Sequence, residues 1–471
     1  MSYQAPDTAV VASASKKKSM IAATAGNILE WYEWSAYAVF APFIAQVVFE
    51  PSSTAAGILA TFGVFAVSFL FRPLGGILFG WLADRKGRKF VLIFTMLMMS
   101  AGSLIIGIMP TYHAVGVWSA VILLAARVIQ GFAHGGESAT STTYVAEIAP
   151  SARRGLWSSV VHIAIVGGSV LAYGLGAVIT TTFGDQAVLD WAWRVPFLIG
   201  AVAALGVLYL RRHMDESDVF EEDAAVSKTS ADPGSEAVAS MGSAPVAAAV
   251  PVWGRWRTIR VAVRMILFTA GITAVHYTWS SYISTYAISS QGMDPSTAYW
   301  VSLVAQCIVL VSLPLFGMLS DRIGRRPQIL FFAVASAILV MPLTAMVGDV
   351  WWTLLVPQTV ALCLWALASS IFAAMQAENF PTHMRTRGIG FAYSMGVAVF
   401  GGTAPYLNQL FVGWGTEWVF HVYIMVLCLF TLITTLMMRE TRGIDLRDVD
   451  AVPAHHAPAR AGTEREIDLS V

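Results

Sequence analysis

Long apolar stretches separated by short polar segments dominate this chain. Each stretch supplies the roughly 20 residues that a helix needs to cross the hydrocarbon core of a bilayer. Six begin near Ile21, Ala55, Phe90, Val117, Leu156 and Trp191, and six more begin near Arg260, Thr297, Gln328, Trp351, Thr386 and Trp418. The pattern predicts an all-α membrane protein with 12 transmembrane helices in two six-helix halves.

Two short polar passages occur twice, at nearly the same interval. Residues 80–89 and 317–326 share the form G-x-L-x-D-R-x-G-R-[K/R], and residues 146–150 and 377–381 share A-E-x-x-P. A duplication explains that agreement, with each passage lying between apolar stretches. Paired helical halves with charged connectors are typical of transporters that rock around a central site.

The composition of the intervening segments sets the expected domain boundaries. An acidic run and then an Ala/Ser/Pro/Gly-rich stretch interrupt the apolar pattern, which predicts a flexible linker. The acidic run could bind a partner, although a solvated surface is the simpler interpretation. We expect a cytoplasmic tail over 1–20, bundles over 21–212 and 259–440, a cytoplasmic linker over 213–258 and a tail over 441–471.

Composition and charge agree with a membrane protein. The 471 residues are 56% hydrophobic and only 12% charged, whereas soluble proteins are about 25% charged. The net charge is zero, so nothing indicates a nucleic-acid partner. The three cysteines, Cys307, Cys363 and Cys428, lie in apolar stretches without metal-ligand spacing and are interpreted as small core residues. We therefore expect no metal and no cofactor.

Lys and Arg concentrate on alternate connectors, and the remaining connectors contain none. Cytoplasmic loops of membrane proteins carry such an excess of positive charge. Both termini and the repeated polar passages are therefore expected on the cytoplasmic side of the membrane.

Five charged residues lie deep within the predicted spans: Glu30, Glu33, Arg72, Arg127 and Glu137. Charges in the hydrocarbon region are costly, so each is a functional candidate. An arginine can hold a carboxylate through two parallel hydrogen bonds, whereas a buried carboxylate can change charge as its access to water changes. The group predicts anion recognition together with proton binding. The alternative is permanent pairing of Glu30 or Glu33 with one of the arginines.

Neighbouring residues extend this candidate site. Pro73 disfavours helical geometry at Arg72, and His134 titrates near neutrality and could join a proton route or simply pack. In the second half no charge is expected deep within a predicted span, but aromatic and polar groups such as Tyr277 and Tyr393 are available. Tyr277 and Trp279 cannot share one helix face, so only part of that cluster can line a cavity.

The chain resembles the major facilitator superfamily, and within it the metabolite:proton symporter family, over roughly residues 20 to 440. The superfamily signature matches residues 80–89 and 317–326. The more specific motifs lie at residues 26–32, 72–76, 127–131, 135–137, 193–197 and 400–404. Carriers of α-ketoglutarate, shikimate, citrate and proline/betaine share these motifs.

The resemblance implies a proton-coupled transporter that imports a small organic anion by alternating access, such as the carboxylate α-ketoglutarate or a related metabolite. Arg72 and Arg127 are expected to clamp the anion, and Gln130, Tyr277 and Tyr393 to complete the substrate site. The alternatives are a zwitterionic osmolyte such as proline or betaine, and shikimate or citrate.

Proton coupling is expected at Glu30 and Glu33, with Glu137 and His134 as further candidates. The superfamily resemblance also implies ion pairs at an inner gate, formed by Asp84, Arg88, Glu147, Asp321, Arg325 and Glu378. We expect a monomer in the bacterial plasma (inner) membrane, with protons, the organic anion and the lipid bilayer as its partners.

The sequence departs from the symporter family's pattern at two positions, and two other classes of protein are considered. The symporter family usually has Asp at the position of Glu33 and a small or aliphatic residue at that of His134. The Pro-containing motif of antiporters is absent around Gly167 and Gly168, which favours symport. A non-transporting receptor is disfavoured because no sizeable signalling domain is present. A membrane enzyme is disfavoured because no nucleophile–base pair or metal cluster is evident.

Overall fold

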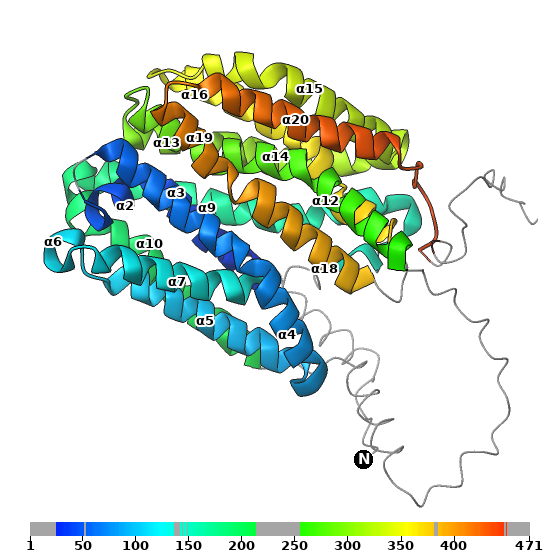
Figure 1. Cartoon of the computed structure of the whole chain (residues 1–471), viewed down its shortest axis with the longest axis horizontal. Helices are drawn as coiled ribbons and strands as arrows, with labels where there is room; N and C mark the ends of the chain where they lie inside the picture. The colour runs from blue at the N-terminus through cyan, green and yellow to red at the C-terminus, as the bar shows by residue number, and fades with distance from the viewer. Residues whose placement is uncertain are drawn as a thin grey trace, which may run out of the picture.

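The computed structural model describes residues 25–50, 53–135, 142–143, 145–147, 149–212, 255–380, 385–446 and 449. Within these ranges the chain is helical and contains no strand (Figure 1). Glu137, residues 1–20 and most of the expected linker and C-terminal tail lie outside them. The side chains of Asp84 and Arg88 also lie outside what is described.

The helices follow the apolar pattern of the sequence. Residues 25–39 form the first described helix. The others in the first half are α2 (Ala41–Val48), α3 (Thr54–Leu70), α4 (Arg72–Lys86), α5 (Arg88–Ile108), α6 (Tyr112–Val115), α7 (Trp118–Gly135), η1 (Ser151–Arg153), α9 (Arg154–Asp190), η2 (Ala192–Arg194) and α10 (Val195–Arg212). Those in the second half are α12 (Arg255–Tyr277), η4 (Thr278–Tyr282), α13 (Ile283–Ser289), α14 (Pro295–Ile323), α15 (Arg325–Ala345), α16 (Trp351–Ser369), α17 (Phe372–Ala377), α18 (Arg385–Gly396), η6 (Val397–Gly401), α19 (Ala404–Gly413) and α20 (Glu417–Leu436).

Nine helical segments of the described chain are long and apolar enough to cross a membrane. One of them, Thr54–Ala83, contains the junction of α3 and α4. The departure from helical geometry expected at Arg72 is wrong: Phe71, at the junction, keeps right-handed helical dihedral angles (φ −81°, ψ −13°). Arg72 begins α4, and Pro73 lies in its first turn, where a missing backbone N–H costs nothing.

The helices gather into two bundles that lie side by side in Figure 1. In the first, α5 packs against α7 and α10; in the second, α20 packs against α12 and α15. Across the interface, α9 packs along α14, and α3 packs along α19. Gly155 at the start of α9 is needed there, because a Cβ at this position would lie 2.6 Å from the carbonyl oxygen of Gly317 on α14.

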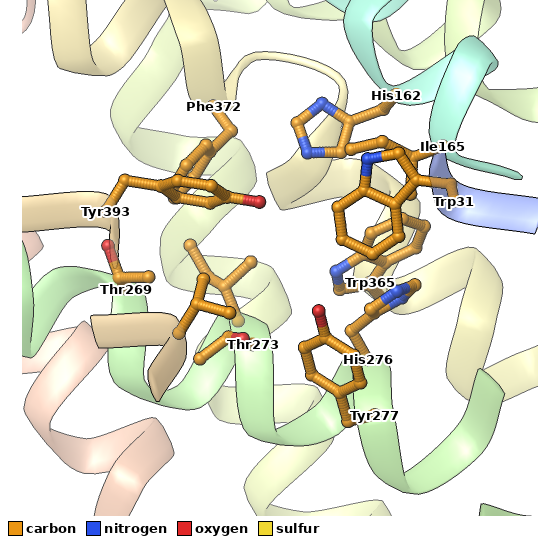
Figure 2. Close-up of a pocket in the computed structure, with 12 residues that line it drawn as sticks. Trp31, His162, Ile165, Thr269, Thr273, His276, Tyr277, Trp365, Phe372 and Tyr393 are labelled. Atoms are coloured by element: carbon orange, nitrogen blue, oxygen red, sulfur yellow. The ribbon is translucent and has the colours of Figure 1, made fainter. Parts of the chain in front are cut away.

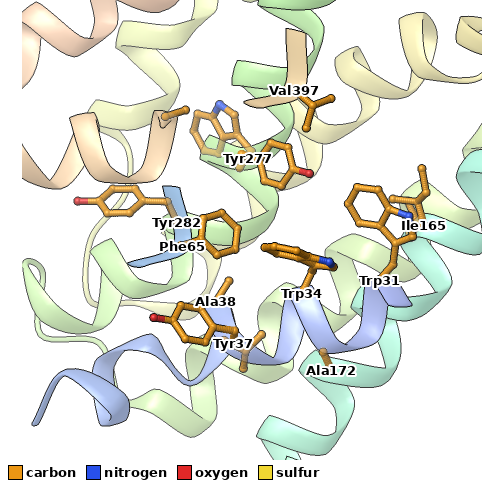
Figure 3. Close-up of a cluster of buried hydrophobic side chains, with 14 of the residues drawn as sticks. Trp31, Trp34, Tyr37, Ala38, Phe65, Ile165, Ala172, Tyr277, Tyr282 and Val397 are labelled. Atoms are coloured by element: carbon orange, nitrogen blue, oxygen red, sulfur yellow. The ribbon is translucent and has the colours of Figure 1, made fainter. Parts of the chain in front are cut away.

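Buried aromatic rings fill the middle of the molecule, between the first helix and the second half (Figure 3). The Trp34 ring packs against Phe65 and Phe69 of α3, and Phe69 lies edge-on to Tyr277 of α12. The interface between the halves is therefore apolar and aromatic at the level where the charged residues are expected.

Candidate functional site

The Trp34 indole lies between two buried guanidinium groups. The Arg72 guanidinium carbon is 4.0 Å from the Trp34 ring centroid, and that of Arg127 is 4.1 Å from it. Arg72 also stacks on Phe69 at 3.6 Å, and Arg127 on Tyr37 at 4.2 Å. Both arginines are 1% exposed. Cation–π contacts stabilise them in part, but an aromatic face does not satisfy their N–H donors.

The donors of these arginines remain largely open. None of the three guanidinium nitrogens of Arg72 forms a hydrogen bond of standard geometry with a described residue, although Tyr277, Tyr393 and Glu30 are close enough for electrostatic contact. Arg127 donates one hydrogen bond, through Nη1 to Gln130, and its Nε and Nη2 have no such partner in the described chain. Buried donors of this kind favour an incoming anion.

Arg127, Gln130 and Glu33 form one connected chain of polar groups. Arg127 Nη1 donates to Gln130 Oε1 at 2.8 Å, and Gln130 Nε2 donates to Glu33 Oε2 at 2.9 Å. Gln130 Nε2 also donates to the Ser103 hydroxyl at 2.9 Å. The amide of Gln130 therefore couples a carboxylate on the first helix to a guanidinium on α7.

Glu30, one turn before Glu33, pairs with His134 of α7. Both side chains are buried. His134 also lies edge-on to the rings of Trp31 and Trp34. Glu30 is in electrostatic contact with Arg72, and Glu33 with Arg127, while the described ion pair of Glu30 is with His134.

A small cavity adjoins this cluster at the interface of the halves (Figure 2). Tyr277 and Tyr393 both line it, as the sequence predicts for substrate-site residues, and Trp31 lines it from the first helix. Trp279 instead lines a separate cavity within the second bundle. This confirms that Tyr277 and Trp279 occupy different helix faces.

At one end of the bundles, which we call the gate end, Asp321 of α14 reaches the first residues of α9. Its carboxylate accepts hydrogen bonds from the backbone N–H of Gly155 at 2.8 Å and of Leu156 at 3.0 Å. Arg325 donates to the same carboxylate at 2.7 Å. A carboxylate is favourable at a helix N-terminus because of the open N–H groups and the helix dipole. Asp321 thus binds the two halves together.

A second set of contacts between the two halves at the gate end is centred on Glu378. Arg154 of α9 donates to its Oε1 at 3.0 Å, Arg325 approaches it at 3.7 Å, and Thr441 donates to its Oε2 at 2.5 Å. Burial raises the pKa of the Glu378 carboxyl, whereas Arg325, Thr441 and Arg154 oppose that shift. The ion pair to Arg154 joins the halves.

Glu147, the remaining gate candidate among the described side chains, pairs with Arg385 of α18 at 2.9 Å. The structure therefore brings Asp321, Arg325 and Glu378 into one cluster and places Glu147 in a second ion pair across the halves. Arg154, Arg385 and Thr441 complete these contacts, and the sequence interpretation missed them as gate residues. The first two belong to the basic groups that follow the repeated A-E-x-x-P passages, which is the signal that could have found them.

The halves also meet at the opposite end of the bundles. The Tyr299 hydroxyl of α14 donates to the Val39 carbonyl at 2.6 Å, and the Tyr173 hydroxyl of α9 donates to the Ser280 carbonyl at 2.7 Å. The cavity therefore lies between two sets of contacts that both cross the interface.

Three comparisons place the chain among known proteins. It matches the sugar (and other) transporter family over residues 18–452. It is 33% identical to the alpha-ketoglutarate permease of Escherichia coli, an alignment that covers 91% of this chain and 95% of that protein. It is 32% identical to an ectoine/proline transporter of Corynebacterium glutamicum over 88% of this chain and 82% of that one. It is 29% identical to the proline/betaine transporter of E. coli, with coverage of 95% and 88%.

Among solved structures, the proton:xylose symporter XylE superimposes with a TM-score of 0.68 at 20% sequence identity, covering 93% of this chain and 99% of that one. An inward-open structure of the E. coli xylose transporter gives a TM-score of 0.65 at 18% identity, with coverage of 92% and 98%. These likenesses show a shared fold.

Proposed function

Because the chain belongs to the sugar (and other) transporter family, within the major facilitator superfamily, we propose that it is a proton-coupled importer of a small organic anion. It is a multi-pass membrane transporter and not an enzyme, as are the relatives it matches. The substrate that we propose first is a carboxylate such as α-ketoglutarate, in the plasma membrane of a bacterium. The relative with 33% identity is an alpha-ketoglutarate permease, which supports this choice.

The observation that carries the proposal is the pair of buried arginines around Trp34. The Arg72 guanidinium lies near Trp31 and Tyr277, which line the cavity between the halves, and most N–H donors of both arginines have no partner of standard geometry among the described residues. A carboxylate entering from the cavity would satisfy them, through charge-assisted and bidentate hydrogen bonds. Gln130, Tyr277 and Tyr393 would complete the site.

The proposed topology has 12 spans with both termini in the cytoplasm. Nine segments have the required length and hydropathy. We assign the other three to residues 25–48, to α7, and to α18 through α19. Of these, α7 contains the buried Arg127, and the first segment contains Glu30 and Glu33. The bundles over 21–212 and 259–440 move as the two halves.

Proton coupling would act through the polar chain from Glu33 to Arg127. Protonation of Glu33 removes its negative charge and so weakens the hydrogen bond that it accepts from Gln130. The Gln130 amide oxygen in turn accepts from Arg127. Proton and anion would then bind cooperatively, because each changes the electrostatic surroundings of the other. Glu30 and His134 form a second buried pair that can take up a proton.

Alternating access would proceed by breaking the gate-end contacts at Asp321, Glu378 and Glu147 while the contacts at the opposite end are kept, and then the reverse. Ion pairs and a helix cap that form in one state and break in the other give a switch between two packed arrangements. The protein would need no second copy for this cycle, since all of these contacts lie within one chain.

The test is uptake of radiolabelled α-ketoglutarate by proteoliposomes with an imposed pH gradient, acid outside. We expect accumulation above equilibrium that collapses when an ionophore dissipates the gradient. Uptake that only equilibrates, with no response to the gradient, would refute proton coupling. Vesicles that take up no carboxylate at all would refute the substrate class.

A second candidate is a zwitterionic osmolyte such as proline or betaine. Five aromatic residues line the cavity: Trp31, Tyr277, Trp365, Phe372 and Tyr393. Aromatic faces recognise quaternary ammonium groups, while the arginines could hold the carboxylate of the same molecule. Several relatives are proline/betaine or ectoine/proline transporters. Competition separates the candidates: unlabelled betaine or proline in excess should leave α-ketoglutarate uptake unchanged if the first proposal is correct.

A further inference from the structure

Two histidines bring polar atoms into the otherwise aromatic cavity. His162 comes from α9 in the first half, and His276 comes from α12 in the second. Each is 6% exposed, and the Nδ1 atom of each has no hydrogen-bond partner within the described part of the chain. Neither residue belongs to the charged cluster around Trp34.

One indole holds both imidazole rings in place. The Trp365 ring of α16 stacks on His276, with centroids 4.2 Å apart and planes at 25°. It also meets His162 edge-on at 5.8 Å, and Phe372 supports His162 from another side at 5.9 Å. The Ser280 hydroxyl oxygen lies 3.4 Å from Nε2 of His276. The rings are thus fixed by packing, and Figure 2 shows His276 beside the Tyr277 ring and His162 on another part of the cavity wall.

Tyr277 connects these histidines to the proposed carboxylate site. Its ring lies edge-on to His276 at 5.0 Å, and its hydroxyl has no hydrogen bond of standard geometry in the described chain although it is in electrostatic contact with Arg72. Trp31 similarly lines the cavity and lies 6.0 Å from the Arg72 guanidinium carbon. Tyr277 and Trp31 therefore lie between the cavity and the Arg72 guanidinium.

A buried polar atom without a partner costs free energy unless a ligand satisfies it. A neutral imidazole offers one donor and one acceptor nitrogen, and a tyrosine hydroxyl can do either. We infer that this cavity binds an oxygen-bearing group close to the substrate carboxylate, so that the transporter selects 2-oxo and 2-hydroxy carboxylates over unsubstituted ones. This inference rests on the proposed carboxylate function and specifies its substrate class.

The residues of the cavity determine the kind of group that fits. Among the described residues that line it there is no Asp, Glu, Lys or Arg, so a keto or hydroxyl oxygen finds neutral partners there. A methylene group in the same place would leave the histidine Nδ1 atoms unsatisfied. Sites built to hydrogen-bond an oxygen reject analogues that lack it for this reason.

The experiment measures displacement of radiolabelled α-ketoglutarate from the purified full-length protein by α-ketoglutarate, 2-hydroxyglutarate and glutarate. Glutarate lacks only the oxygen at carbon 2. In the unmodified protein we expect glutarate to bind at least about 10-fold more weakly than the other two. His162→Phe and His276→Phe both keep a ring against Trp365. In these variants the affinity for α-ketoglutarate should fall about 3- to 10-fold, while the affinity for glutarate should be unchanged.

Two further variants keep the test decisive. His162→Asn restores a donor and an acceptor close to the position of Nδ1 and should recover most of the discrimination. His421→Phe lies on α20, away from the cavity, and should leave the discrimination between α-ketoglutarate and glutarate unaltered. Equal binding of α-ketoglutarate and glutarate by the unmodified protein would overturn the inference but leave the carboxylate function standing. Binding of betaine, with no binding of any carboxylate, would overturn both.

Discussion

Both halves of the molecule bury charges at the gate end, but in the described chain the first half also buries charges deep within its helices. Glu30, Glu33, Arg72 and Arg127 are all at most 4% exposed, and the two arginines contact Trp34. Arg154 is the buried charge of the first half at the gate end. The charged residues buried in the described second half are Arg325, Glu378 and Arg385, and all belong to the gate contacts. The duplicated halves have thus diverged in where they carry charge.

The two copies of the repeated motif differ as well. In the second copy, a Cβ at Gly317 would lie 2.7 Å from the Gly155 oxygen, and Asp321 caps α9. In the first copy, a Cβ at Gly80 would meet no described atom within 4 Å. The second copy therefore fastens the halves together through described contacts, and no such contact is described at the equivalent glycine of the first. We infer from this difference that binding and gating are separable, with binding mainly in the first half and gating centred on Asp321, Arg325 and Glu378.

The largest expected effect comes from neutralising the first half's carboxylates. Glu33→Gln keeps the shape of the side chain but removes its titration, so gradient-driven accumulation should be abolished. Counterflow between labelled and unlabelled substrate should survive within about 3-fold, because exchange need not return an empty, deprotonated carrier. Both assays are run on the same proteoliposomes, beside Glu30→Gln.

Glu417→Gln at the start of α20 is the matched control in the second half, and it should accumulate substrate normally. If Glu30→Gln and Glu33→Gln both accumulated substrate with an unchanged pH profile, the proton site would lie elsewhere and the proposed role of the first half would be wrong.

A smaller effect is expected from the second half's gate. Asp321→Asn weakens both the cap on α9 and the ion pair with Arg325, so exchange should slow about 10-fold in either direction, as loss of a hydrogen bond to a charged group implies. Substrate affinity should change little. Asp349→Asn, at an exposed position, is the control. An Asp321→Asn protein whose affinity alone changed would contradict the separation of gating from binding.

The smallest effect is expected from Trp34→Phe, which shrinks the ring between the two guanidinium groups. Phenylalanine is a weaker cation–π partner than tryptophan, so the arginines should be less well positioned and the affinity for α-ketoglutarate should fall about 3-fold. Trp81→Phe changes a cation–π pair with Arg85 outside this cluster and should leave affinity unaltered. An unchanged Trp34→Phe protein would show that the indole does not position the arginines.

Sequence alone predicted the all-helical fold and the two halves, because apolar length and a repeated motif are local features. It also singled out Arg72, Arg127, Glu30 and Glu33, because a charge inside an apolar stretch is costly wherever it packs. It did not predict that Trp34 lies between the arginines or that Glu30 pairs with His134. These contacts depend on how the first helix is rotated against α4 and α7, which hydrophobic periodicity does not determine.

The contacts at the gate end were also predicted only in part from the sequence. Asp321 and Glu378 were predicted from their repeated motifs, but the backbone N–H groups of Gly155 and Leu156 as the partners of Asp321 were not. Thr441 was missed because it lies in a segment assigned to the tail. Contacts between residues far apart in the chain come from the docking of the halves, and only the folded structure shows them. The membrane orientation and the number of spans remain predictions.

Equilibrium binding of labelled α-ketoglutarate to Arg72→Lys and to Arg325→Lys tests the central claim most directly. Both variants keep the positive charge and lose the guanidinium geometry, one in the middle of the first half and one at the gate of the second. We predict that Arg72→Lys weakens binding about 100-fold, since two charge-assisted hydrogen bonds are lost, and that Arg325→Lys binds normally but transports slowly. Near-normal affinity in a correctly folded Arg72→Lys protein would contradict the account.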